Sequence, residues 1–400
     1  MLAGAGTGVM TYARALQTAQ SSLSEQALTL SGGDVSSPGS PQSLLDRITR
    51  ALRSAVPLDV STRVTPSGFV RHDVFRLAHA YFTLHGALLT VRVPGPPGIM
   101  HWSYPLPLRL SGWDNVYTVH DLIPLTDPEL TPIDGARHRR LLQQITRSAA
   151  AIVTVSEAAA RTIESELDAA ALRVVNCSQP VTVQQDQTLD PILPVGLVRN
   201  QYLLVCGLIE PRKNIARILA AYRASGSSLP LVISGPDGWE AATIAAALQN
   251  TVGVVRLPYQ TRAVTLALLK HARAVLMPSL AEGFGLPVAE AMALGTPVIT
   301  SNIGALAETA GGAALLVDPY NVDEIMEAIR KVQHDSMVCQ TLSAAGQARA
   351  AAFAPDRFVE QLRTLYDDIA QHHMAGNLRP LCIQQHKVAF KVSLARGQRR

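Results

Sequence analysis

The chain has little charge and few aromatic residues. Of its 400 residues, 16% are charged and 5% are aromatic, whereas 48% are hydrophobic. A chain this apolar does not stay disordered, and its length suffices for two ordinary domains. The net charge of +4 comes without the basic stripe that nucleic-acid binding usually requires. The composition therefore predicts a globular protein and argues against a nucleic-acid partner.

Cysteines and long apolar runs are also scarce. The only cysteines are Cys177, Cys206, Cys339 and Cys382. They lie far apart, without a C-x-x-C pair or a histidine at ligand spacing, which argues against a disulfide framework and a zinc site. No apolar run reaches the roughly 18 residues of a membrane span, and the first residues lack the pattern of an export signal. We therefore expect a cytoplasmic protein.

The second half of the chain repeats one pattern. From about Gln201, short runs rich in Val, Ile and Leu alternate with turn residues and with segments of helical spacing. The predicted strands are YLLVCG, PLVISG, VVRLP, AVLMPS, TPVITS and AALLVD. The predicted helices between them are Asn214–Ala224, Glu240–Gln249, Ala263–His271 and Asp323–Gln333. Six buried strands with crossover helices indicate an α/β fold with a doubly wound parallel sheet.

The first half is more diffuse but has similar strands. They are GIMHWS, NVYTVHD, AAIVTVS and LRVVN, and Ser156 is a suitable N-cap for the helix that follows the third of them. The segment DPILPVGLVRN has the composition of an interdomain hinge, which places a boundary near residue 195. The Ser/Gly/Pro-rich segment Glu25 to Gln42 is expected to be a surface loop. A second α/β domain is therefore predicted.

The stretch from 279 to 300, SLAEGFGLPVAEAMALGTPVIT, runs from a strand through a glycine loop into a helix. Pro287 suits the first helical position because its φ is fixed and its missing N–H would be unpaired there. Free N–H groups and the positive end of the helix dipole then face the loop that contains Gly283 and Gly285. Glycines let a ligand approach the backbone closely. The pattern predicts a site for phosphate or another anion.

Two glutamates flank this helix start. Glu282 lies in the loop and Glu290 lies one turn inside the helix, so both carboxylates can face one bound molecule, for which a diol is the natural partner. Alternatively, Glu290 is only a favourable first-turn charge and the glycines only form a turn. The features taken together favour a binding site.

Two further pairs of polar residues follow predicted strands. Arg212 and Lys213 follow YLLVCG at the carboxyl edge of the sheet, where open α/β sheets bind ligands and where a diphosphate would neutralise them. The alternative is an ordinary solvated pair of charges. His120 and Asp121 follow NVYTV, and a histidine at a strand end facing a cleft is a candidate substrate contact as well as a candidate structural residue.

These motifs together are recognisable. The run EGFGLPVAEAMALGTPVIT with its paired glutamates, together with EPRKN and HDLIP, resembles glycosyltransferase family 4, retaining enzymes of the GT-B fold. The resemblance spans nearly the whole chain and implies two Rossmann-like doubly wound domains that face each other across a cleft. Residues 1–195 would form the acceptor-side domain, 196–355 the nucleotide-sugar domain, 356–375 a helix crossing back, and 376–400 a basic tail.

The resemblance also implies an activity. It is transfer of a hexose from a nucleoside-diphosphate sugar, with its anomeric configuration kept, to a glycan or lipid-linked glycan in cell-surface polysaccharide synthesis. HDLIP is similar to the corresponding segment of mannosyltransferases, so mannose from GDP-mannose is the expected donor. Two alternatives are a non-catalytic sugar-nucleotide-binding protein and a sugar-nucleotide epimerase. A dinucleotide-dependent oxidoreductase is disfavoured because GAGTG at residues 4 to 8 has the wrong glycine spacing.

Roles follow from the resemblance position by position. Glu290 would hold the donor ribose and Glu282 the sugar hydroxyls, while Lys213 with Arg212 would neutralise the diphosphate. His120 would approach the sugar from the other domain. The remaining positions implied to contact the donor, by backbone groups or beside His120, are Gly6, Gly8, Asp121, Gly283, Phe284, Gly285 and Leu286.

Metals and cofactors are not expected. The chain contains no Asp-x-Asp pair, and preorganised cations with helix-end amides stabilise a departing diphosphate without a metal. The six cations after residue 376 have no acidic residue among them, so the tail is either a solvated end or a contact with the anionic inner face of a membrane.

Three positions depart from the family pattern. Leu208 stands where many relatives have an arginine, so Arg212 is expected to take over that phosphate contact. Pro355 stands where relatives often have a tryptophan near the last helix. Relatives also begin with a strand before the glycine loop, for which Met1 leaves no room. We therefore expect either an apolar segment upstream of Met1 or a looser N-terminal domain.

Overall fold

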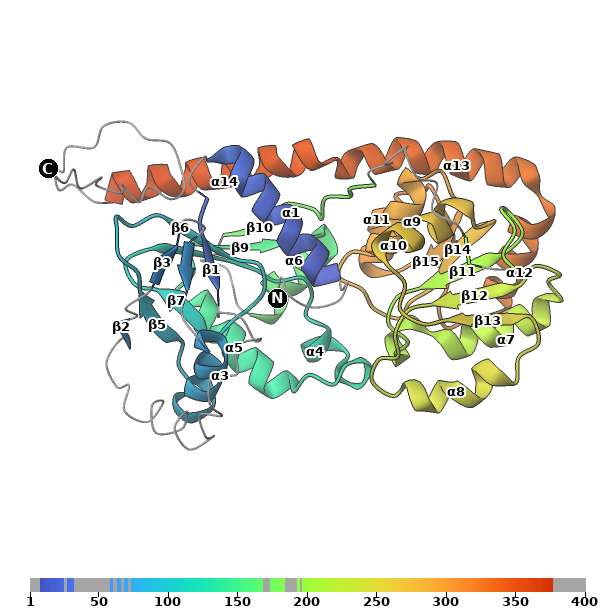
Figure 1. Ribbon diagram of the computed structural model, residues 1–400, viewed down its shortest axis with the longest axis horizontal. Helices are drawn as coiled ribbons and strands as arrows, with labels where there is room; N and C mark the ends of the chain where they lie inside the picture. Colours follow the sequence, from blue (N-terminus) through green and yellow to red (C-terminus); the bar gives the residue numbers. More distant parts are fainter. Residues whose placement is uncertain are drawn as a thin grey trace, which may run out of the picture.

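The computed structural model describes residues 8–24, 27–31, 58–59, 63–65, 68–70, 73–167, 173–183, 193–194 and 196–376. Two α/β lobes lie side by side, and the helices α13 (Ser336–Ala350) and α14 (Pro355–Gly376) run along one side of both (Figure 1). Gly6, Cys382, the residues before Gly8 and the basic tail lie outside the described residues, as does most of the predicted loop 25–42.

The C-terminal lobe contains one parallel sheet of six strands in the order β13-β12-β11-β14-β15-β16. The strands are β11 (Leu203–Cys206), β12 (Leu231–Ser234), β13 (Val254–Leu257), β14 (Ala274–Met277), β15 (Val298–Ser301) and β16 (Leu315–Val317). The helices are α7 (Ile215–Ser225), α8 (Ala241–Gln249), α9 (Arg262–His271), α10 (Leu286–Ala293), α11 (Gly304–Ala310) and α12 (Val322–His334), with the short η2 (Pro211–Lys213). This order is that of a doubly wound sheet, as predicted.

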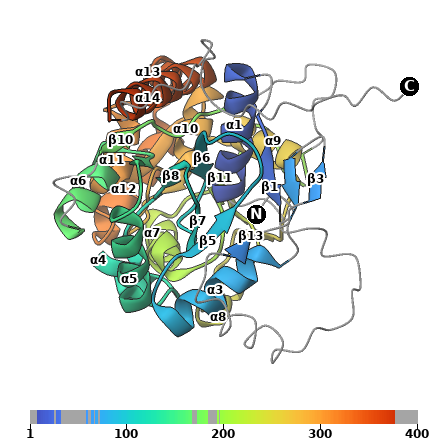
Figure 2. The ribbon, with the colours of Figure 1, turned by 90° about the vertical axis from the view of Figure 1, so that its left-hand side faces the viewer.

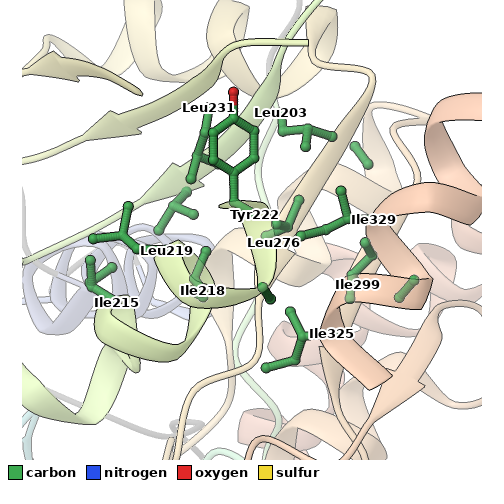
Figure 3. Packing of buried hydrophobic residues seen from close by; sticks show 14 of the residues in the cluster. Leu203, Ile215, Ile218, Leu219, Tyr222, Leu231, Leu276, Ile299, Ile325 and Ile329 are labelled. Atoms are coloured by element: carbon green, nitrogen blue, oxygen red, sulfur yellow. The ribbon is translucent and has the colours of Figure 1, made fainter. Parts of the chain in front are cut away.

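Successive residues of each strand enter opposite cores. Leu203 and Val205 pack with α7 and α12 on one face (Figure 3), whereas Leu204 and Cys206 pack with α9, α10 and α11 on the other. Because helices cover both faces, the strands read in sequence as continuous apolar runs.

The N-terminal lobe divides its strands among three sheets, where one sheet was expected. The largest is parallel, with the order β10-β9-β8-β6, and the others have the orders β2-β5-β7 and β1-β4-β3. The strands are β1 (Thr29–Ser31), β2 (Leu58–Asp59), β3 (Arg63–Thr65), β4 (Gly68–Val70), β5 (Leu89–Arg92), β6 (Ile99–Trp102), β7 (Leu108–Leu110), β8 (Asp114–Thr118), β9 (Ala151–Thr154) and β10 (Val174–Asn176). The presence of β1 corrects the expectation that 25–42 is entirely loop.

Asn115 shows why β7 does not pair with β8. Its side-chain amide accepts from Leu110 N at 2.9 Å and donates to Leu110 O at 2.9 Å, so it takes both backbone groups that a neighbouring strand would use. It also accepts from Trp102 Nε1 and donates to Trp113 O. At Leu110, the last residue of β7, the Asn115 side chain thus takes the place of a backbone partner from a neighbouring strand.

The N-terminal helices are α1 (Gly8–Leu23), α3 (Val74–His85), α4 (Ile123–Thr126), α5 (Gly135–Thr146) and α6 (Glu157–Glu166), with the short η1 (Pro128–Leu130). Ser156 caps α6 as predicted, because its Oγ accepts from Ala159 N. Among the described helices, none has the length and apolar character needed to cross a membrane.

The helix α14 packs on the N-terminal lobe although the chain reaches it from the C-terminal lobe. It lies beside α1 (Figures 1 and 2), and Phe358, Leu362 and Tyr366 share a core cluster with Tyr12 and the β8 and β9 strands. Pro355 is the first residue of α14, preceded by the short η3 (Ala351–Phe353). Phe353 packs edge-on against Phe284. Phe284 belongs to the loop 282–285 before α10, which we call the donor loop because the sequence predicts that it contacts the donor.

We predict that Asn115→Ala destabilises the protein by about 2–4 kcal/mol, because the buried groups of Leu110, Trp102 and Trp113 then lose their partners. Urea unfolding followed by fluorescence measures this change. The control is Asn250→Ala, which removes an exposed side chain from the end of α8. Equal unfolding midpoints for the two variants would contradict the bridging role of Asn115.

Candidate functional site

The loop before α10 turns its carbonyl groups away from the helix start. Gly283 O accepts from Ser156 Oγ at 2.8 Å, and Phe284 O accepts from Thr309 Oγ1 at 2.6 Å. Within the described part of the chain, no group accepts from the N–H of Phe284, Gly285 or Leu286. The helix begins at Leu286, which places Pro287 second rather than first. Three free amides at a helix start are the geometry of an anion site.

Both glycines of this loop are required by close approaches. A Cβ at Gly283 would lie 2.3 Å from the carbonyl oxygen of His120, and Gly285 has φ +94 with Leu306 2.5 Å from the position of its Cβ. The first approach brings the donor loop directly against the end of β8 in the other lobe.

Glu282 lies between the two predicted cations. Its Oε2 is 2.5 Å from Arg212 Nη1 and its Oε1 is 2.6 Å from Lys213 Nζ. Burial raises the pKa of Glu282, but the two facing cations outweigh burial and bring the pKa to about 2. Both carboxylate oxygens are therefore engaged by cations, and the contact of Glu282 with sugar hydroxyls stays a prediction.

Glu210 completes this cluster and was not among the residues predicted from sequence. Its Oε1 is 2.6 Å from Arg212 Nε, so the guanidinium is shared by two carboxylates. Burial lowers the pKa of Lys213 and Glu282 opposes that effect. The cluster contains two cations and two carboxylates, so a bound diphosphate would have to compete for cations that are already paired.

Glu290 has a separate partner, Arg262 at the start of α9. Glu290 is 2% exposed, and its Oε1 forms an ion pair with Arg262 Nη2 at 2.6 Å. Burial raises the pKa of Glu290 and Arg262 opposes the rise. Arg262 was not predicted, although its place in the segment that follows the carboxyl end of β13 is a usable signal.

His120 faces the donor loop from the end of β8. Its Nε2 is 3.1 Å from Ser103 O, and since a carbonyl only accepts, Nε2 carries the hydrogen. Burial lowers the pKa of His120 to about 4, so the ring is neutral at pH 7 and keeps Nδ1 as an acceptor. The ring edge of Tyr12 from α1 lies against it with centroids 4.8 Å apart, and Tyr104 stacks on it at 6.5 Å.

Asp121 and Gly8 complete the predicted set within the described residues. Asp121 accepts from Ile123 N at 3.1 Å, and burial raises the pKa of Asp121 while Arg212 opposes the rise. Gly8 begins α1, whose first turn lies near the boundary between the lobes (Figure 1). In the described ranges no three histidine, cysteine or carboxylate side chains are grouped as metal ligands would be.

A half-open cavity of about 260 Å³ lies between the lobes next to this cluster. Its lining includes Asp121, Ile123 and Thr162 from the N-terminal lobe and Ser279, Glu282 and Tyr320 from the C-terminal lobe. The cavity therefore joins the sequence-predicted residues Asp121 and Glu282, whereas Glu290 is not part of its lining.

Solved structures share this two-lobe arrangement. Sucrose-phosphate synthase from Thermosynechococcus elongatus matches with a TM-score of 0.57 and 19% identity, over 82% of this chain and 93% of that one. HepE from Anabaena, in complex with UDP and glucose, matches with a TM-score of 0.53 and 19% identity, over 64% and 72% of the two chains. These likenesses establish a GT-B fold.

Sequence comparisons give the family. The family described as "Glycosyl transferases group 1" matches residues 197–349. The O-antigen chain mannosyltransferase B of Escherichia coli is 33% identical over 285 residues, which cover 66% of this chain and 72% of that protein. The serotype-specific mannosyltransferase WbdA of Escherichia coli is 28% identical over 63% of this chain, which spans only 33% of that longer protein. The chain belongs to the group 1 glycosyltransferases, and the predicted fold class, family and enzyme class are confirmed.

The depressed pKa of Glu282 predicts a pH-dependent contribution to stability. Because the folded pKa of about 2 lies below the ordinary 4.5, ionised Glu282 stabilises the fold above about pH 4.5 and this contribution is lost as the pH falls toward 2. The difference in unfolding free energy between the parent and Glu282→Gln should be constant from about pH 7 to 5 and should shrink below about pH 4.5. Urea unfolding at each pH measures it, and a difference that grows with acid contradicts the assignment.

Proposed function

We propose that the protein transfers mannose from GDP-mannose, with retention of anomeric configuration, to a glycan or lipid-linked glycan during polysaccharide assembly. The relatives support this proposal, because two are mannosyltransferases named for O-antigen chains or serotype. A third, an MMP alpha-(1->4)-mannosyltransferase of Mycolicibacterium hassiacum, is 27% identical over 61% of this chain and 62% of that protein.

The observation that carries the proposal is that Arg212 and Lys213 both contact Glu282, the residue before Gly283. The same loop packs against the His120 backbone at Gly283, and the amides that follow have no acceptor among the described residues. Transfer requires the bond between the sugar and the diphosphate to break, and negative charge develops on the diphosphate as it leaves. Fixed cations and backbone donors stabilise that charge more in the transition state than in the ground state. The neutral His120 adds an acceptor on the other side of the loop.

The state of Glu282 supports retention without an enzyme-bound sugar. A carboxylate with a pKa of about 2, held by cations at both oxygens, is weakly basic and is not free to attack the anomeric carbon. We infer that the acceptor enters on the face that the diphosphate leaves.

The cavity between the lobes supports a neutral glycan as acceptor. Asp121, Asp127 and Glu282 line it together with Thr162 and Tyr320, a set suited to sugar hydroxyls and unfavourable to phosphate. We place the reaction at the cytoplasmic face of the membrane, in keeping with the cationic tail of the sequence.

Substitution of the two glutamates should separate binding from turnover. Glu290→Ala is expected to raise the KM for GDP-mannose at least about tenfold, whereas Glu282→Ala is expected to lower kcat by about 10²-fold with a smaller effect on KM. Steady-state transfer assays measure both, with the exposed Glu327→Ala as control and melting temperatures to detect unfolding. If both variants stay within about twofold of the parent, the site is assigned to the wrong residues.

Transfer should not need a divalent metal, because Arg212, Lys213 and the amides before α10 already supply positive charge for the diphosphate. We expect the initial rate to be unchanged after dialysis against EDTA and after later addition of manganese or magnesium. A rate that falls with EDTA and returns with either ion contradicts this mechanism.

A further inference from the structure

Glu308 reaches across the boundary between the lobes. It lies on α11, and its two carboxylate oxygens accept from Glu157 N and Ala158 N of α6, each at 2.8 Å. The helices α6 and α11 lie side by side in both views (Figures 1 and 2). These two N–H groups belong to the first turn of α6 and have no acceptor within their own helix.

Ser156 supplies the remaining contacts at this helix end. Its Oγ accepts from Ala159 N at 3.1 Å and donates to Gly283 O at 2.8 Å, and its carbonyl accepts from Ala160 N. The first turn of α6 is thus completed partly by its own cap and partly by a carboxylate from the other lobe.

The backbone that carries Glu308 is tied to the donor loop. Thr309 Oγ1 donates to Phe284 O at 2.6 Å. From α13, Arg349 donates to Glu308 O at 2.7 Å and to Thr309 O at 3.1 Å. A displacement of Glu308 is therefore transmitted to the loop that contains Gly283, the residue packed against the His120 backbone.

We propose that Glu308 is a positioning residue that seats the donor loop against the N-terminal lobe for transfer. The inference rests on the proposed function and deepens it. When the lobes separate, water solvates both the carboxylate and the two N–H groups, so the contact exists only in the closed arrangement. Glu308 touches neither the sugar nor the diphosphate in this role and acts through the position of Gly283 and Phe284.

The first test replaces the carboxylate. Glu308→Gln keeps the shape but turns an NH₂ group toward one of the two N–H donors. We expect kcat with GDP-mannose to fall about tenfold, the effect of losing roughly one charge-assisted hydrogen bond, while the donor KM changes less than about twofold. The control is Glu327→Gln, the same charge change at an exposed position of α12, which should leave kcat unchanged.

The second test removes one donor from the backbone. Glu157→Pro deletes the N–H that binds Glu308, and proline fits here because Glu157 is the first residue of α6 and the preceding Ser156 is extended, with φ −156 and ψ 157. Its matched control, Glu157→Ala, keeps the N–H and loses only the exposed side chain that contacts Asn176. We expect Glu157→Pro to reproduce Glu308→Gln, Glu157→Ala to behave as the parent, and the double variant Glu157→Pro with Glu308→Gln to be no worse than either single one.

A third measurement does not depend on transfer. Small-angle X-ray scattering of the full chain with GDP should give a larger radius of gyration for Glu308→Gln and Glu157→Pro than for the parent and the two controls. The same radius for all five proteins would overturn the role of Glu308, as would a kcat for Glu308→Gln within about twofold of the parent. If the two variants have larger radii of gyration than the parent but the parent itself transfers no sugar, the proposed function is refuted and the positioning contact still stands.

Discussion

The approach of Gly283 to the backbone of His120 is the contact on which the site depends. Only a residue without a side chain allows it, since a Cβ would lie 2.3 Å from the His120 carbonyl oxygen. The Ser156 hydroxyl fixes the same loop by donating to Gly283 O. Through these contacts the donor loop of one lobe, the end of β8 and the start of α6 form one surface. The charged cluster of the C-terminal lobe therefore lies close to Asp121, the residue after His120, and shares a cavity with it.

Burying the charged cluster at this surface costs desolvation free energy, and its positive and negative charges balance. Arg212 and Lys213 are matched by Glu210 and Glu282, and the shortest ion-pair distances are 2.5 to 2.6 Å. Buried ion pairs of this kind contribute little to stability relative to apolar residues of the same size, because desolvation offsets their attraction. Their value lies in holding two cations in fixed positions at the sheet edge, where reorganisation during the reaction is small.

The sequence was most informative where a single physical pattern dominates. All six strands of the C-terminal sheet were predicted, because helices cover both faces and the strands are continuous apolar runs. The three-residue strand Thr29–Ser31 has no such run. The side chain of Asn115 bonds to the backbone of Leu110, a contact that no periodicity of the sequence predicts. The ion pair of Glu290 with Arg262 joins residues from two helices, α10 and α9, so it depends on how the sheet order places these helices and not on local spacing.

The path of the chain between the lobes limits how they can move. The described part of the N-terminal lobe ends at Val183 before the chain continues into the C-terminal lobe, and the chain returns to the N-terminal lobe through Phe353 into α14. Val181 N donates to Phe353 O at 2.9 Å, so these two crossings are bonded to each other. Because α14 packs on the N-terminal lobe, with Tyr366 hydrogen-bonded to His101, it moves with that lobe. Two crossings joined at one point favour rotation about that point over translation, and Phe353, which packs on Phe284, lies at this point.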